Sequence, residues 1–111
     1  MSDQPSPIFD HILREDLKGM MEPEDLQALD DELCEDMAEM LPQIEAAAQA
    51  GDAVAVAFLT HKLKGGSESL GVAGLARELL SVEQAARAGE ICDLTALQAA
   101  AQVTTKALTA F

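Results

Sequence analysis

The chain has 111 residues and a net charge of −13, and 49% of its residues are apolar. This length suits one domain with one hydrophobic core, and the charge argues against binding to nucleic acid or to an anionic membrane surface. The first fifteen residues lack the basic start and the apolar run of a signal peptide, and no apolar stretch is long enough to cross a membrane. We therefore expect a cytoplasmic protein, with Cys34 and Cys92 as free thiols.

The N-terminal residues predict a tail followed by a short helix. We expect residues 1–7 to form a flexible tail, with Ser6 as the N-cap and Pro7 in the first turn of a helix that continues to Gly19. Apolar residues recur at helical spacing in this segment, and they are Ile8, Phe9, Ile12, Leu13 and Leu17.

A second helix is predicted to begin at Pro23 and to end at Gly51, with a bend before Pro42. Its apolar residues recur every three or four positions, which predicts a buried face, and acidic residues between them predict a solvated face. The apolar set is Leu26, Leu29, Leu33, Met37, Met40, Leu41 and Ile44, and the acidic set is Asp30, Asp31, Glu32, Glu35, Asp36 and Glu39.

Three further helices are predicted in the second half of the chain. Asp52 is a good N-cap for a helix that continues to Leu70, and Gly71 supplies the stop. The next two helices cover about 73–88 and 93–110. Because no segment alternates with a period of two, we predict an all-α fold, an antiparallel up-down four-helix bundle with a short additional N-terminal helix, formed by residues 8–111.

His61 is the most informative residue of the helix predicted over 52–70. On a helical wheel Leu59 and Leu63 lie about 160° from it, and Leu70 lies about 180° from it. These leucines predict the buried face, so His61 is expected to point into solvent. The outer face around it is predicted to hold Val54, Ala57, Phe58, Lys64, Gly65 and Glu68.

The neighbours of His61 favour phosphoryl transfer. A neutral imidazole nitrogen is a good nucleophile near neutral pH, and Lys64 can pair with phosphoryl oxygens as charge develops. Gly65 and Gly66 each cost about 1 kcal/mol relative to alanine inside a helix. We interpret Gly65 as space for a bulky partner beside the imidazole, Gly66 as a site of close helix packing, and Phe58 as part of a docking surface.

This segment resembles the signature H-x-L-K-G-x-S-x-x-L-G of histidine phosphotransfer (Hpt) domains. The matching residues are His61, Leu63, Lys64, Gly65, Ser67, Leu70 and Gly71. The Ala50-Gly51-Asp52 turn before them and the following Leu75, Leu79, Glu83, Arg87 and Gly89 also resemble this family, so the resemblance extends over roughly residues 8–108.

The resemblance implies that His61 accepts a phosphoryl group through Nε2, that Lys64 assists at the phosphoryl oxygens, and that Ser67 supports the helix or the site. The implied partners are receiver domains of response regulators and a sensor or hybrid histidine kinase. Mg²⁺ would come from the receiver domain, and the chain would need no cofactor of its own. We expect a monomeric phosphocarrier without kinase activity, with Val54, Ala57, Phe58, Gly65 and Glu68 in contact with the partner.

Three other functions fit the sequence less well. The phosphoacceptor part of a sensor kinase resembles H-E-x-[K/R]-x-P, but Lys62 follows His61 and no proline follows within the helix. A di-metal bundle needs Glu-x-x-His pairs, but Ile8 and Phe58 precede the two histidines by three residues. A docking or adaptor module that has lost phosphotransfer remains the alternative, although the intact motif argues against it.

Overall fold

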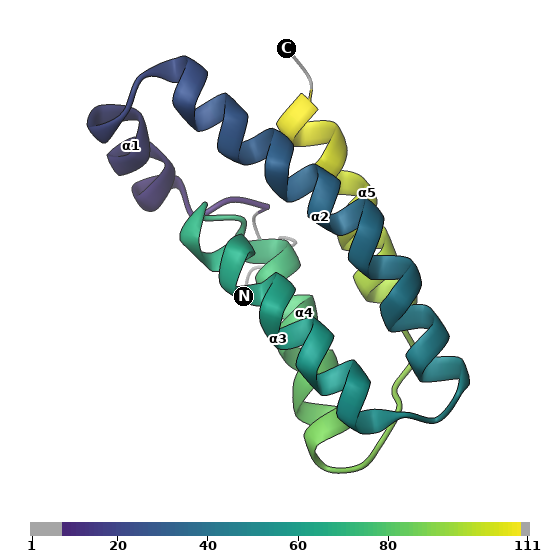
Figure 1. Cartoon of the computed structure of the whole chain (residues 1–111). Coiled ribbons are helices and arrows are strands. Elements are labelled where there is room, and N and C mark those ends of the chain that lie inside the picture. Colours follow the sequence, from purple (N-terminus) through teal and green to yellow (C-terminus); the bar gives the residue numbers. More distant parts are fainter. Residues whose placement is uncertain (1–7, 110–111) are drawn as a thin grey trace.

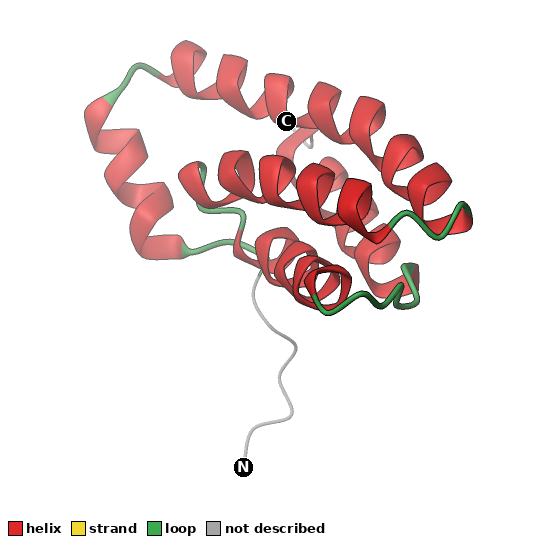
Figure 2. Cartoon of the chain, turned by 60° about the horizontal axis from the view of Figure 1, so that its bottom comes forward, coloured by secondary structure: helices red, strands yellow, loops and turns green. Residues whose placement is uncertain are grey.

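The structure, a computed structural model, describes residues 8–109, and this range holds five helices and no strand. They are α1 (His11–Met20), α2 (Pro23–Gln49), α3 (Ala53–Ser69), α4 (Ala73–Arg87) and α5 (Thr95–Thr109). Helices α2 to α5 lie side by side with alternating directions, and α1 lies at one end of them (Figures 1 and 2). The predicted all-α fold, an up-down four-helix bundle with a short N-terminal helix, is confirmed.

The bundle core is built from the apolar stripes of the four long helices. Its most completely buried members include Ile44 from α2, Val56 from α3, Leu75 and Leu79 from α4, and Leu97 from α5. Met37 and Met40 also lie in this core, as predicted. None of the five helices in residues 8–109 combines the length and the apolar character that crossing a membrane requires.

The ends of α3 agree closely with the prediction. The side chain of Asp52 accepts a hydrogen bond from the backbone N–H of Ala55 at 3.0 Å, so Asp52 caps the helix. Gly71 follows the helix with a φ of 70°, a left-handed conformation that glycine adopts without strain. Both ends of the helix that carries His61 are therefore set by local sequence.

The predicted start of the first helix is wrong. α1 begins at His11, and its N-cap is Asp10, whose side chain accepts from the N–H of Leu13 at 3.1 Å. The preceding residues bond to the α3–α4 turn instead: the N–H of Gly74 donates to the Ile8 carbonyl, and the N–H of Asp10 donates to the Gly71 carbonyl. The predicted N-cap at residue 6 and the tail over 1–7 lie outside the described residues.

α2 begins at Pro23 as predicted and continues through Pro42. A proline has no N–H to donate within the helix, so the carbonyl of Ala38, four residues earlier, loses its usual helical donor. The helix continues past this position without a break, and the bend before Pro42 stays a prediction.

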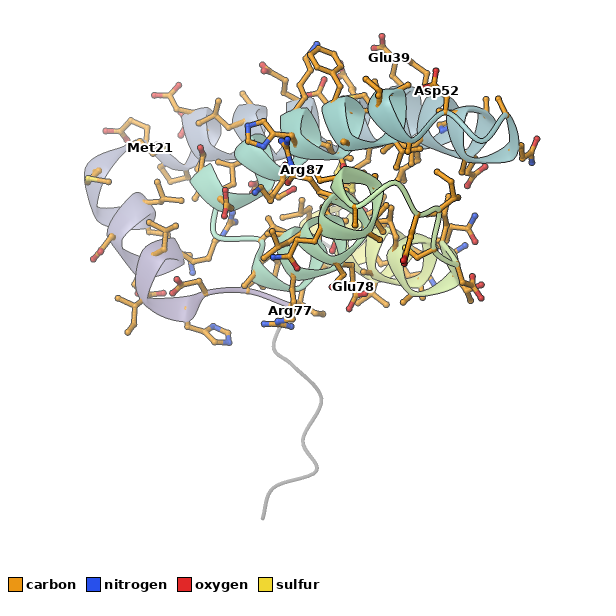
Figure 3. The ribbon with its side chains drawn as sticks, turned by 90° about the horizontal axis from the view of Figure 1, so that it is seen from below. Met21, Glu39, Asp52, Arg77, Glu78 and Arg87 are labelled. Atoms are coloured by element: carbon orange, nitrogen blue, oxygen red, sulfur yellow. The ribbon has the colours of Figure 1, made fainter. Side chains whose placement is uncertain are left out.

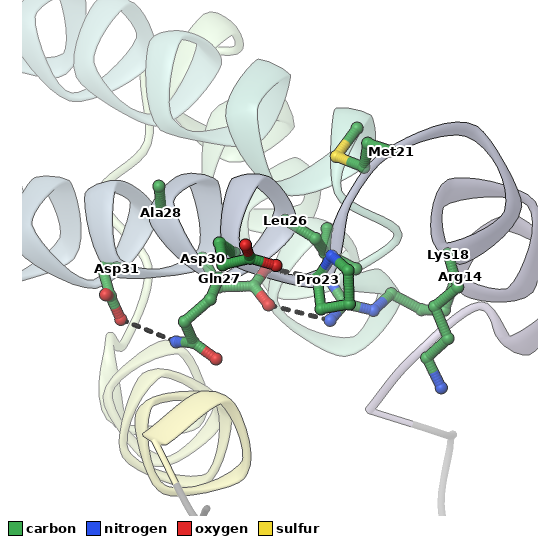
Figure 4. Close-up of a pocket in the computed structure, with 10 residues that line it drawn as sticks. Arg14, Lys18, Met21, Pro23, Leu26, Gln27, Ala28, Asp30 and Asp31 are labelled. Atoms are coloured by element: carbon green, nitrogen blue, oxygen red, sulfur yellow. Dashed lines mark hydrogen bonds and ion pairs between the residues drawn. The ribbon is translucent and has the colours of Figure 1, made fainter.

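The prediction for Asp30 and Leu29 is also wrong. Leu29 is exposed, whereas Asp30, placed on the solvated face by the sequence pattern, is only 2% exposed. Its two carboxylate oxygens each accept a hydrogen bond from the guanidinium of Arg14 in α1 at 2.9 Å (Figure 4). Arg14 also donates to the Leu70 carbonyl at 3.0 Å, at the end of α3. The buried pair thus ties α1 to α2 and to the helix that carries His61.

We predict that Arg14→Ala lowers the free energy of unfolding by about 3 kcal/mol, because a buried carboxylate loses its partner. Lys18→Ala is the matched control, since Lys18 lies on the same helix and pairs with Glu15 on the surface. That loss should stay below about 1 kcal/mol. Urea unfolding followed by circular dichroism measures both values, and equal losses in the two variants would contradict this role for Arg14.

Candidate functional site

His61 lies on the outer face of α3, and 62% of its side chain is exposed. The opposite face of the same helix is buried and includes Val56, Leu63 and Ser67. The outward orientation predicted from the helical wheel is therefore confirmed. A rigid helix presents the imidazole to solvent, where a second protein can reach it.

The imidazole is held from behind by Glu83 of α4. Nδ1 of His61 lies 3.0 Å from Oε2 of Glu83, whose side chain is only 5% exposed. Two cations complete the cluster: Arg87 donates to the same oxygen from Nε at 2.9 Å and from Nη2 at 2.7 Å, and Nζ of Lys64 lies 3.0 Å from Oε1. One buried carboxylate therefore joins three basic side chains from two helices.

This environment determines the charge of Glu83. Burial alone would raise its pKa, but the basic groups of Arg87, Lys64 and His61 outweigh burial and hold the pKa at about 2. Near neutral pH Glu83 is thus a carboxylate that can only accept hydrogen bonds. We assign the ring proton of His61 to Nδ1 from this hydrogen bond, which leaves the lone pair of the neutral ring on Nε2.

Lys64 is less free than the sequence indicated. Its side chain was placed on the open outer face, but it is only 16% exposed and is ion-paired with Glu83. The ammonium group has three N–H donors, and the contact with Glu83 engages it on one side. Lys64 is therefore part of the cluster that holds the imidazole as well as a neighbour of the reactive ring.

Sequence reasoning missed the role of Glu83 and Arg87 in this cluster. A signal was present, because Glu83 continues the four-residue spacing of the buried Leu75 and Leu79. A glutamate on a buried stripe needs positive partners, and Arg87 follows one turn later. In Figure 3, Arg87 lies where α4 faces α3, and Glu78 projects from another edge of α4.

The predicted partner surface is mostly exposed. Val54 and Phe58 are large exposed apolar residues, and Glu68 is exposed as well. The space beside Gly65 is open, because a Cβ atom added there would meet no atom within 4 Å. Ala57 is the exception, because only 9% of it is exposed and it packs in the bundle core. The outward position predicted for Ala57 is therefore wrong.

Ser67 is buried in the bundle, whereas Gly66, predicted to be a site of close helix packing, is exposed. Ser67 is fully buried, and its hydroxyl donates to the Leu63 carbonyl at 2.9 Å, one turn earlier. A Cβ atom at Gly66 would lie 3.7 Å from Cδ1 of Leu33 in α2, in ordinary contact. Ser67 therefore supports the helix behind His61, whereas the close packing predicted for Gly66 is wrong, because an alanine would fit there. Within residues 8–109, no three His, Cys, Asp or Glu side chains come together as metal ligands.

The comparisons with known proteins agree with this geometry. The family model of the Hpt domain matches residues 28–110. The chain belongs to the Hpt domain family. A solved structure, that of histidine-containing phosphotransfer protein B (HptB) from Pseudomonas aeruginosa PAO1, is similar to this Hpt domain with a TM-score of 0.71 and 31% sequence identity. The match covers 96% of this chain and 89% of that chain. No curated protein sequence matches the chain.

The family and the structural match establish the general function. This Hpt domain is a histidine phosphotransfer protein of a phosphorelay, a phosphocarrier that interacts with response regulators and kinases. Nothing in the fold or the comparisons favours the alternative, a docking module that has lost phosphotransfer. The described site has an exposed imidazole, as a phosphocarrier requires.

The depressed pKa of Glu83 predicts a specific dependence of stability on acid. The stabilisation by its charged form is complete above pH 4.5, the ordinary pKa, and is lost as the pH falls toward about 2. A shift of this size corresponds to about 3 kcal/mol. Glu83→Gln should therefore be less stable than the wild type near neutral pH, and the difference should shrink over this window. Urea unfolding at a series of pH values measures it, and a difference that does not change with pH would contradict the assignment.

Proposed function

We propose that His61 is the phospho-accepting residue, and that it exchanges a phosphoryl group with the aspartate of a receiver domain through Nε2. The observation that carries this proposal is the hydrogen bond between Nδ1 and Glu83 on a side chain that is 62% exposed. It orients the ring and leaves Nε2, on the other side of the imidazole, for the phosphorus atom. His11 is exposed as well, but within residues 8–109 its ring has no carboxylate partner comparable to Glu83.

The proposed exchange needs little chemistry from the chain itself. The lone pair of Nε2 attacks the phosphorus of an aspartyl phosphate, and the bond from phosphorus to the aspartate oxygen breaks with its electrons on that oxygen. Lys64 lies one turn after His61 and keeps donors for the phosphoryl oxygens while it contacts Glu83. Its charge would stabilise the negative charge that develops during transfer.

The receiver domain would supply what this chain lacks. We propose that it brings the aspartate and the Mg²⁺, which neutralises charge on the phosphoryl oxygens. We also propose that it docks on Val54, Phe58, Gly65 and Glu68, with the space at Gly65 admitting it beside the ring. The cluster around His61 is complete within one chain, and we propose that the protein acts as a monomer. We also propose that it has no kinase activity of its own.

We predict that His61→Gln abolishes labelling by a phosphorylated receiver domain, because no nucleophilic nitrogen remains at this position. The wild type should carry an acid-labile, base-stable phosphate, as expected for a phosphoramidate. His11→Gln is the control and should label normally. Mass spectrometry of the intact chain and its peptides measures the label, and a circular dichroism spectrum confirms that the helices persist. Normal labelling of His61→Gln would move the acceptor elsewhere.

Lys64→Ala is expected to slow phosphoryl transfer by at least about tenfold while receiver binding changes little, because charge stabilisation is lost in the transition state. Lys62→Ala is the control, since Lys62 is an exposed lysine of the same helix. Rapid-quench transfer rates and a receiver titration separate the two effects. Equal rates for Lys64→Ala and Lys62→Ala would remove the role given to Lys64.

A further inference from the structure

The hydrogen bond between His61 and Glu83 bears on the chemistry of the phosphorylated state. We propose that Glu83 keeps the proton on Nδ1 while the phosphoryl group is on Nε2, so that the ring can always leave as a neutral imidazole. This inference rests on His61 being the phosphorylated residue. It makes Glu83 a positioning residue that determines how readily the phosphoryl group is passed on.

Phosphorylation of Nε2 leaves a proton on Nδ1 and a positive charge on the ring. When Nε2 attacks phosphorus, the new N–P bond uses the lone pair of the ring, and Nδ1 keeps its hydrogen. The product is a phosphorylated imidazolium, with one positive charge on the ring. In water such a ring can lose the Nδ1 proton to solvent and become neutral. In this site the charged ring lies 3.0 Å from a carboxylate, which favours the protonated form.

The reverse step depends on the same proton. An acceptor oxygen attacks phosphorus, the N–P bond breaks, and its electron pair returns to Nε2. If Nδ1 still carries its proton, the leaving group is neutral imidazole. If the proton has gone, the leaving group is an imidazolate anion, which is far more basic and leaves much more slowly. A retained proton therefore keeps the phosphoryl group transferable.

The surrounding cations explain why Glu83 holds this proton on the ring and does not remove it. Oε2 already accepts two hydrogen bonds from Arg87, and Oε1 lies 3.0 Å from the ammonium of Lys64. These contacts stabilise the charged form of Glu83, and its pKa of about 2 agrees with a carboxylate that does not accept a proton near neutral pH. Within residues 8–109, Lys64 of α3 and Glu83 and Arg87 of α4 are the charged groups in this cluster.

The test uses the rate at which the phosphorylated chain loses phosphate to water. In this hydrolysis a water oxygen attacks phosphorus, the N–P bond breaks toward Nε2, and inorganic phosphate is released. The whole chain is phosphorylated with phosphoramidate, the label is mapped to His61, and its loss is followed over a series of pH values. The rate falls as the pH rises through the value at which Nδ1 loses its proton. The midpoint of the pH profile therefore gives this value independently of the absolute rate.

We expect the midpoint of the wild type to lie at least about one pH unit above that of Glu83→Gln, a tenfold change in proton affinity. Glu78→Gln is the matched control, because Glu78 is a carboxylate of the same helix that lines the groove between α4 and α5. Its midpoint should equal that of the wild type. A synthetic phosphohistidine peptide with the sequence of residues 58–68, which lacks Glu83, should also have a midpoint below that of the wild type.

The outcomes separate this inference from the proposed function. If the wild-type chain takes no label on His61, the proposed function fails. If His61 is labelled but the midpoints of the wild type and Glu83→Gln coincide, the inference fails and the proposed function stands. If Glu83→Gln does not fold, the wild type is compared with the phosphopeptide, and coincident midpoints again overturn the inference.

Discussion

The site depends on one buried carboxylate. Glu83 brings a negative charge into the contact between α3 and α4, where it would be costly without partners. His61, Lys64 and Arg87 all bind it, so a single side chain orients the reactive ring and gathers positive charge around it. The imidazole itself stays exposed because its partner is buried behind it. The imidazole is therefore held in one orientation and is still accessible to a second protein.

The rest of the fold keeps α3 in place for this arrangement. Leu63 and Ser67 anchor the inner face of the helix. The buried pair of Arg14 and Asp30 secures the far end, since Arg14 also bonds to the carbonyl that ends α3. Gly65 leaves the outer face open one turn beyond the ring. Rigidity on one face and open space on the other describe a helix that presents a nucleophile to another protein.

Much of this could be predicted from local patterns. The order of the helices, the cap at Asp52 and the outward direction of His61 follow from spacing and capping within one segment, and all three are confirmed, although the first helix begins later than predicted. The motif around His61 also indicated the family that the comparisons establish. These features share one property: they depend on residues close together in the sequence.

The errors concern residues whose environment comes from another helix. Asp30 was assigned to solvent because its neighbours are acidic, but Arg14, sixteen residues earlier, makes its burial possible. Ala57 was placed on the open face, but it packs in the core that the bundle helices share. Lys64 and Glu83 meet only because α3 and α4 pack together. A helical wheel treats one helix in isolation, so it cannot show which of its borderline positions a neighbour will cover or pair.

The tautomer of His61 in the unphosphorylated chain tests the central claim most directly. Nitrogen-15 NMR of the imidazole at mildly alkaline pH distinguishes a protonated from an unprotonated ring nitrogen. The account predicts a proton on Nδ1, bonded to Glu83, and a lone pair on Nε2. A ring with its proton mainly on Nε2, or an even mixture of the two tautomers, would contradict it.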